Sequence, residues 1–185
     1  MTYIEGPSLD KIIESNDRIE PEHVSWMSQR ILNALHYLHF NGIIHGDVKP
    51  QNIIIKPKEH NAVLVDYGLS ITGTNGKTLP EGYTPLFAAP EILDGKPPLP
   101  ESDIYSLGLT MIYALGGDPV RKTYPKDTPK EIQNYFDSMV VYNPMDRPNW
   151  QKIDLVKKLS DIREKVFGCR HSNSKLEIKL KGGDK

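Results

Sequence analysis

The chain has 185 residues, of which 38% are hydrophobic, so it can bury the core of one domain. Its 23 basic and 24 acidic side chains nearly cancel, which excludes the strong net field that draws proteins to nucleic acid or anionic membranes. No apolar run approaches the roughly 20 residues that span a bilayer, and residues 1–7 do not form a signal peptide. A lone Cys169 cannot form an internal disulfide. We therefore expect a cytoplasmic protein that binds neither nucleic acid nor membrane.

The first part of the chain predicts two helices followed by short strands. Ser8 is expected to cap a short helix through its side chain. A longer helix begins at Pro21, a residue suited to a first turn, and ends at Asn41-Gly42. Its apolar residues recur every three or four positions: Val24, Met27, Ile31, Leu35 and Leu38. Three β-favouring runs then predict small paired strands at residues 43–44, 53–55 and 62–65.

The second part is predicted to be helical after a loop. Residues 70–85 are rich in Gly, Thr and Pro and have little periodicity, which indicates a long loop. Residues 103–115 are apolar on most sides, as in a helix buried at the centre of a domain. Thr128, followed by Pro129 and Glu131, predicts a capped helix start. A final amphipathic stretch has its apolar residues on one side: Trp150, Ile153, Val156, Leu159, Ile162 and Val166.

Four polar residues lie close to the ends of the predicted strands. Asp47, Lys49 and Asn52 fall within six residues, and Asp66 ends the next β-favouring run. Each alone is better interpreted as a turn, surface or capping residue, but their joint order between strands favours one cleft. Phosphoryl transfer needs such a set, because carboxylate and amide oxygens suit Mg²⁺, a cation offsets phosphoryl charge, and a second carboxylate orients the nucleophile.

The motifs around these residues resemble those of eukaryotic-type serine/threonine protein kinases. Residues 45–52, His-Gly-Asp-Val-Lys-Pro-Gln-Asn, resemble the family's His-Arg-Asp-Leu-Lys-Pro-x-Asn, and Asp66-Tyr67-Gly68 resembles Asp-Phe-Gly. Residues 84–91, Thr-Pro-Leu-Phe-Ala-Ala-Pro-Glu, resemble Thr-Pro-x-Tyr-x-Ala-Pro-Glu. Residues 103–108 and 143–148 match further motifs in family order. The resemblance implies a kinase-like C-lobe over residues 1–168, mainly α with small β-strand pairs, and we expect a flexible tail over residues 169–185.

The resemblance also implies a role for each matching residue of the catalytic motifs. Asp47 would accept or orient the proton of the substrate hydroxyl, and Lys49 would neutralise the γ-phosphate of ATP. Asn52 and Asp66 would hold Mg²⁺. Lys49 is in addition the mark of serine/threonine rather than tyrosine kinases, and Thr84 is expected to contact it.

Two further parts of the chain are assigned by the same resemblance. Residues 1–6 resemble the hinge, so the backbone of Thr2 and Ile4 would meet adenine and Ile54 would form its floor. Glu91 and Arg147 would form a buried ion pair.

The chain departs from the family pattern at one catalytic-loop position. Gly46 replaces the Arg that grips a phosphorylated activation loop in the family, which argues against control by loop phosphorylation. His45-Gly46-Asp47 also occurs in small-molecule kinases of the aminoglycoside phosphotransferase type. Lys49, together with the Asp-aromatic-Gly, Ala-Pro-Glu and Asp-Arg-Pro motifs, favours a protein kinase over that group.

The sequence begins almost at the hinge, so the family's Gly-rich strand pair, strand Lys and helix Glu have no counterpart in it. We expect a truncated or single-lobe form, and expect these residues alone to be inactive. Two functions stay open. The first is a serine/threonine protein kinase that uses ATP and Mg²⁺ on a protein substrate, with the missing N-lobe supplied elsewhere, for instance by a partner. The second is a catalytically inactive lobe that acts as a protein-binding scaffold.

Overall fold

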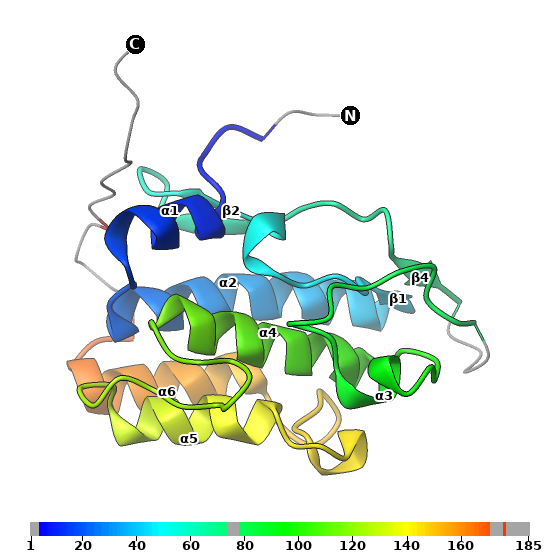
Figure 1. The fold of residues 1–185 in the computed structure, drawn as a ribbon. Helices are drawn as coiled ribbons and strands as arrows, with labels where there is room; N and C mark the ends of the chain where they lie inside the picture. Colours follow the sequence, from blue (N-terminus) through cyan, green and yellow to red (C-terminus); the bar gives the residue numbers. More distant parts are fainter. Residues whose placement is uncertain (1–3, 74–77, 171–175, 177–185) are drawn as a thin grey trace.

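Two long helices, α2 (Pro21–Phe40) and α4 (Pro100–Ala114), pack against each other at the centre of the computed structural model (Figure 1). The structure describes residues 4–73, 78–170 and 176. Helices α5 (Lys130–Met139) and α6 (Leu155–Phe167) pack against α4 and α2, respectively. The described chain is therefore mainly helical with small antiparallel strand pairs, as predicted.

Helix α2 confirms the prediction from its periodicity. All five apolar residues of the predicted stripe are buried. The helix ends where the Asn41-Gly42 pair stops it, and Gly42 takes a φ of +69°, which favours glycine. Helix α4 begins three residues earlier than predicted, because Ser102 Oγ accepts a hydrogen bond from the Leu99 amide at 2.9 Å and closes the first turn.

Two predicted side-chain caps are wrong. Helix α1 (Leu9–Asn16) follows Ser8, but the Ser8 side chain makes no capping hydrogen bond, and its backbone bridges to Ile54 instead. Helix α5 begins one residue after Pro129, and Thr128 does not cap it through its side chain. The backbone of Ser8 is thus held by a neighbouring strand, whereas the Thr128 carbonyl accepts a hydrogen bond from Gln133 Nε2 of α5 itself at 2.8 Å.

The strands form two antiparallel pairs. Strand β2 (Ile53–Lys56) pairs with β3 (Asn61–Leu64), with Ile53 opposite Leu64. Strand β1 (Ile43–Ile44) pairs with β4 (Ile71–Thr72), with Ile44 opposite Ile71. The second pair corrects the prediction of an uninterrupted loop over residues 70–85, because β4 lies inside that range.

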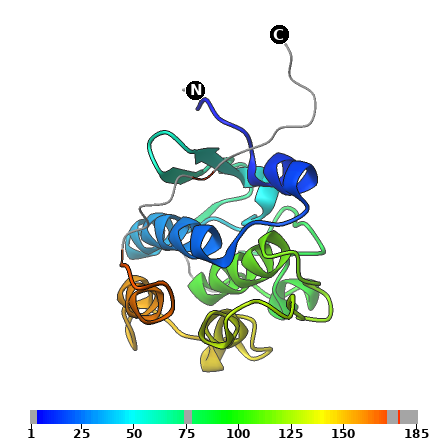
Figure 2. The same ribbon diagram turned by 90° about the vertical axis from the view of Figure 1, so that its left-hand side faces the viewer.

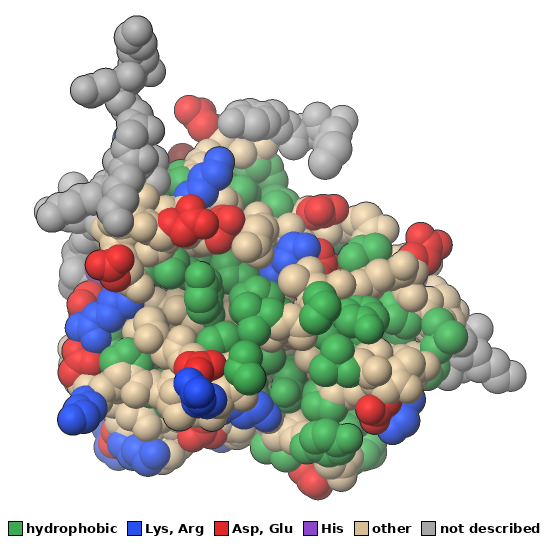
Figure 3. All heavy atoms as spheres, in the orientation of Figure 1, with side chains coloured by type: hydrophobic (Ala, Val, Ile, Leu, Met, Phe, Trp, Pro, Cys, Tyr) green, Lys and Arg blue, Asp and Glu red, His purple; other side chains and the backbone are tan. Residues whose placement is uncertain are grey.

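The short helix α3 (Pro90–Leu93) joins the segment after β4 to α4 (Figure 1). On the face drawn in Figure 3, charges of both signs gather on the side of α5 and α6, whereas apolar side chains are more frequent toward α3. No helix in the described parts of the chain has both the length and the apolar content needed to cross a bilayer.

Helix α6 ends at Phe167, where Gly168 takes a left-handed φ of +72°. The division into a domain and a flexible tail at residue 168 stays a prediction, because residues 171–175 and 177–185 lie outside the described part of the chain.

Candidate active site

The buried carboxylate of Asp103 anchors the loop that carries the predicted catalytic residues. Asp103 accepts hydrogen bonds from the backbone amides of His45 at 2.8 Å and Gly46 at 2.9 Å. Its third donor is His39 Nε2 at 2.8 Å. Trp150 Nε1 donates to His39 Nδ1 at 2.9 Å, which fixes the proton of His39 on Nε2. The start of α4 therefore fixes the path of the catalytic loop.

The loop histidine is held in one tautomer. His45 is fully buried, and its Nδ1 accepts from the Asp47 amide at 3.3 Å. Its Nε2 therefore carries the proton and donates to the Val65 carbonyl at 3.1 Å. This neutral ring ties the loop to the end of β3, one residue before Asp66, and so brings the two predicted motifs together.

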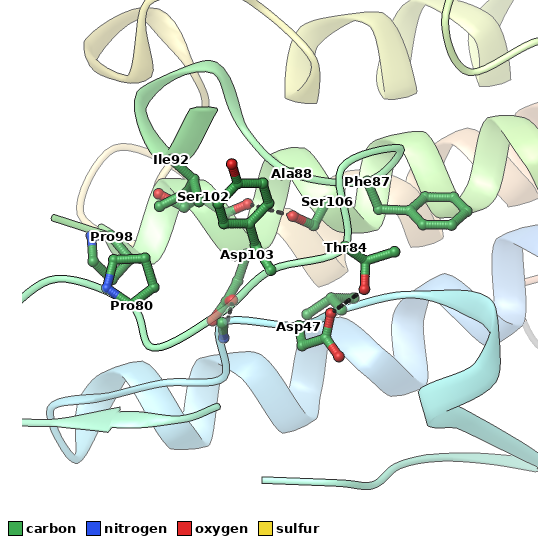
Figure 4. A pocket seen from close by; sticks show the side chains of 13 residues that line it. Asp47, Pro80, Thr84, Phe87, Ala88, Ile92, Pro98, Ser102, Asp103 and Ser106 are labelled. Carbon is green, nitrogen blue, oxygen red and sulfur yellow. Dashed lines mark hydrogen bonds between the residues drawn. The ribbon is translucent and has the colours of Figure 1, made fainter. Parts of the chain in front are cut away.

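Asp47, Lys49 and Thr84 form a closed triangle of contacts. Lys49 Nζ lies 2.6 Å from Asp47 Oδ2 and donates to Thr84 Oγ1 at 2.9 Å. The Thr84 hydroxyl donates to Asp47 Oδ1 at 2.8 Å, and Figure 4 shows this bond. The predicted contact between Lys49 and Thr84 is confirmed. Asp47 is buried and Lys49 half-buried, so these contacts hold both side chains in fixed positions.

Asn52 is oriented by the same carboxylate. Its Nδ2 donates to the Asp47 carbonyl at 2.8 Å and to Asp47 Oδ2 at 3.0 Å. Both donors of the amide are thereby turned toward Asp47, and Oδ1 accepts no hydrogen bond from the described residues. The Val65 amide donates to the Asn52 carbonyl at 2.9 Å, which places Asn52 beside the chain that leads into Asp66.

Asp66 is exposed and takes a φ of +63°, with Oδ1 accepting from the Gly68 amide at 3.2 Å. An amide oxygen and a carboxylate on neighbouring strand ends are hard oxygen donors that fit Mg²⁺. No group of three or more His, Cys, Asp or Glu side chains suited to a metal occurs in the described ranges. A two-residue set agrees with an ion that keeps water and phosphate oxygens in its shell.

The predicted adenine contacts stay a prediction. Ile4 and Ile54 are both partly exposed, as residues that touch a ligand must be, and Thr2 lies outside the described residues. The segment after Ile4 is packed tightly on β2, because a Cβ at Gly6 would lie 2.5 Å from the Ile55 carbonyl oxygen. The Pro7 carbonyl accepts from the Ile55 amide at 2.9 Å. The opening segment therefore runs beside the strand that carries Ile54.

Glu91 and Arg147 form the predicted buried pair. Arg147 Nη1 and Nη2 donate to the two Glu91 oxygens at 2.7 and 2.8 Å, and Ser102 Oγ donates to Oε1 at 2.6 Å. Burial alone would raise the pKa of the Glu91 carboxyl, but the hydrogen bonds from Arg147 and Ser102 outweigh burial and hold that pKa below its usual value. Arg147 also donates to three backbone carbonyls and stacks over Tyr105.

A narrow pocket with a free volume of about 10 Å³ lies between residues 46–48 of the catalytic loop, residues 80–98 and the start of α4. Asp47, Thr84 and Phe87 line it at one end, and Pro80, Ile92 and Pro98 line it at the other (Figure 4). This volume admits about one water molecule. The pocket is therefore too small for a nucleotide.

Gly46 occupies a position where a side chain is strongly disfavoured. It takes a φ of +81°, and an added Cβ would lie 2.7 Å from the Leu69 carbonyl oxygen. We expect Gly46→Ala to destabilise the chain by about 2–4 kcal/mol, from left-handed strain of roughly 1–2 kcal/mol plus the clash. Gly42→Ala is the matched control, because Gly42 has a φ of +69° and open space around its Cβ position. Urea unfolding of both variants measures the difference, and equal losses would contradict the close contact.

The comparisons with known proteins agree with this geometry. The family model of the protein kinase domain matches residues 1–176. The chain belongs to the protein kinase family. Over 125 residues, or 66% of the chain, it is 35% identical to mitogen-activated protein kinase kinase kinase 8 of Rattus norvegicus. It is 37% identical over 121 residues, or 61% of the chain, to serine/threonine-protein kinase D of Synechocystis sp..

A third relative is an SNF1-related protein kinase catalytic subunit alpha of Arabidopsis thaliana, 31% identical over 140 residues, or 75% of the chain. The matched parts make up 26%, 23% and 27% of these three relatives, so the chain spans about a quarter of their length.

The sequence interpretation of this protein kinase chain missed the support beneath the loop. Trp150 was assigned only to a helical stripe, and His39 received no role. Trp150 nevertheless fixes the tautomer of His39, and His39 in turn donates to Asp103. Thr110 supports the loop as well, through its hydroxyl 3.4 Å from the Val48 carbonyl. A polar residue inside an otherwise apolar helix was the available signal, since buried polar groups need partners.

Proposed function

We propose that this chain transfers the γ-phosphoryl group of ATP to serine and threonine hydroxyls of protein substrates. The observation that carries the proposal is the closed set of contacts among Asp47, Lys49 and Thr84, extended to Asn52 through Asp47. A scaffold has no physical need to hold a carboxylate, a cation and an amide in one fixed arrangement at a cleft, whereas phosphoryl transfer depends on such positioning.

The roles follow from the chemistry of the groups. The substrate hydroxyl oxygen would form a bond to the γ-phosphorus while the bond from that phosphorus to the bridging oxygen of ADP breaks. Asp47 would orient the hydroxyl and receive its proton. Lys49, which lies between Asp47 and Thr84, would offset the negative charge of the moving phosphoryl group.

The proposed contacts with Mg²⁺ and ATP follow the family resemblance. Asn52 Oδ1 and the Asp66 carboxylate would hold Mg²⁺, which supplies charge neutralisation on the phosphates when bound. The backbone of Thr2 and Ile4 and the side chain of Ile54 would contact adenine. The other half of the ATP clamp would come from outside these 185 residues, through a longer polypeptide or a partner. Free, half-buried Cys169 suits a reducing cytoplasm, where we place the reaction.

Transfer of labelled phosphate tests this proposal. The chain, in its full polypeptide or with the lobe that completes it, is incubated with γ-labelled ATP, Mg²⁺ and casein, and the labelled amino acids are identified after hydrolysis. We expect phosphoserine and phosphothreonine, and no label without Mg²⁺. A folded protein that binds other proteins but transfers no phosphate would instead support the scaffold function, and label on tyrosine would contradict the assignment of Lys49.

A further inference from the structure

A second cavity lies far from the catalytic loop, between the first half of α2, the turn joining β2 to β3, and α6. Figure 2 shows these three elements one below another on one side of the molecule. The cavity has a volume of about 350 Å³, which falls in the range of small-ligand sites. Its walls combine an indole, a histidine and four cations: Trp26, His60, Arg30, Lys157, Arg163 and Arg170.

Arg163 is the unexplained residue of this cavity. Its side chain is 1% exposed, and its Nη1 donates to Gln29 Oε1 and, at 2.9 Å, to the Arg170 carbonyl. Its Nε and Nη2 are buried and have no hydrogen-bond partner among the described residues. A guanidinium has five N–H donors, of which Nε and Nη2 carry three. An unsatisfied buried charge is costly, so a buried arginine normally has its donors paired.

The position of Arg163 on α6 makes this arrangement unusual. The buried face of the helix consists of Leu155, Leu159 and Arg163, at intervals of four residues. The predicted stripe is confirmed at Leu159, which is fully buried, whereas Val156 and Ile162 pack against the core while only partly buried. Because an apolar residue would fill the third position at lower cost, packing alone does not account for an arginine there.

The surroundings of Arg163 contain charges of both signs, from Arg30 and Glu22, and a second buried polar atom without a hydrogen-bond partner in the described chain. His60 Nε2 is buried without a hydrogen-bond partner in the described chain. Burial lowers the pKa of His60, and the positive charges of His23, Arg163 and Arg30 lower it further, although Glu22 acts in the opposite direction. Trp26 packs edge-on against the His60 ring, with centroids 4.2 Å apart.

Three other charged groups of the cavity have partners. Lys157 Nζ donates to Asp161 at 2.7 Å, and Arg170 Nε donates to Glu164 at 2.7 Å. The carboxylate of Asp154 lines the cavity, but it accepts from the Lys157 amide as the N-cap of α6. Arg163 is close enough to feel the negative charge of Glu22 and the positive charge of Arg30, but no described group accepts a hydrogen bond from its Nε–Nη2 edge.

We propose that this cavity binds a phosphate monoester, whose oxygens pair with the Nε–Nη2 edge of Arg163 and with His60. The guanidinium edge offers two parallel donors, which suits two phosphate oxygens, and a third oxygen remains for His60. A phosphate monoester also carries up to two negative charges, against one for a carboxylate, so it offsets the buried charge of Arg163 more fully. The volume beyond the phosphate, next to Trp26, fits an organic body of the ester. The site is independent of phosphoryl transfer.

The direct test follows the Arg163 Nε–H signal by NMR in a ¹⁵N-labelled chain during titration with phenyl phosphate. We expect that signal and the His60 ring signals to shift in a saturable way, while the signal of exposed Arg121 stays in place. Sodium acetate at matched ionic strength should produce no saturable shift. Signals of Arg163 and His60 that do not move with phenyl phosphate would overturn the proposal.

Two variants separate binding from a structural role. Arg163→Met removes the unsatisfied charge at similar volume, so we expect an equal or higher Tm without ligand and at least tenfold weaker binding of phenyl phosphate. His60→Ala, at a half-buried position, should weaken binding several-fold with the fold intact. A large drop in Tm of Arg163→Met, together with unchanged binding by His60→Ala, would show that Arg163 serves packing only.

A third experiment distinguishes a free small phosphate ester from a phosphorylated side chain of a protein. A short peptide that carries phosphotyrosine is titrated beside phenyl phosphate. Binding of phenyl phosphate alone would assign the site to a free small phosphate ester, and equal or tighter binding of the peptide would assign it to a phosphorylated side chain.

Discussion

Arg147→Ala is expected to lower the free energy of unfolding by about 3–5 kcal/mol, because it leaves a buried carboxylate without its partner. Glu91 is 5% exposed and Arg147 is 1% exposed, so water cannot replace the lost hydrogen bonds. The same substitution frees three backbone carbonyls that Arg147 holds. Urea unfolding followed by circular dichroism measures the loss.

Arg121→Ala is the control for this experiment, because the Arg121 side chain is 81% exposed in its pair with Asp118. We expect it to change stability by less than about 1 kcal/mol. A loss below about 1 kcal/mol in Arg147→Ala as well would contradict a stabilising role for the buried pair.

The pair of Glu91 and Arg147 should make the free energy of unfolding depend on pH in the acidic range. The pKa of Glu91 is lower in the folded chain than its ordinary value of 4.5, so the unfolded state binds the proton more readily. The contribution of Glu91 is therefore complete above pH 4.5 and is lost as the pH falls through its lower folded value. Below pH 4.5 the unfolding free energy of the unmodified chain should fall more steeply than that of Glu91→Gln, and parallel curves would contradict this.

Asp47→Asn is expected to lower the rate of phosphoryl transfer by about 10²–10⁴-fold, the usual contribution of a positioned general base. The asparagine keeps the size of the side chain and can still contact Thr84 and Lys49, but it cannot receive the hydroxyl proton. The initial rate of label transfer from ATP to casein measures the effect.

Asp94→Asn provides the matched control, because Asp94 is exposed and pairs only with Lys96 in the described contacts. Its transfer rate should stay within about twofold of the unmodified chain, since a surface pair has little influence on a distant site. A similar rate in Asp47→Asn would show that the proton acceptor is another group.

The sequence pattern was sufficient to predict the parts of this chain whose structure depends on residues close together in the sequence. The period of α2 and the order of the catalytic motifs depend on residues a few positions apart, and both were found. The contact of Lys49 with Thr84 and the pair of Glu91 with Arg147 followed from the family resemblance.

The features that were missed depend on distant partners. Strand β4 has two residues, and only its pairing with β1 defines it. Ser8 and Thr128 have the right residue types for caps, but β2 holds the backbone of Ser8. No role was predicted for Arg163, and an arginine is rarely buried, yet α6 packs on α2 and Arg163 belongs to its buried face.

Calorimetric titration of the chain with ATP and Mg²⁺ tests most directly the central claim that Asn52 and Asp66 form a metal-dependent nucleotide site. Asp66→Asn removes a carboxylate but keeps a residue type that tolerates the left-handed backbone. Asp17→Asn is the matched control, because Asp17 is exposed and has a φ of +62°, against +63° for Asp66.

We predict binding in the micromolar to low-millimolar range that requires Mg²⁺, persists in Asp17→Asn and weakens at least tenfold in Asp66→Asn. No binding by the folded chain, or equal binding by Asp66→Asn, would contradict the claim.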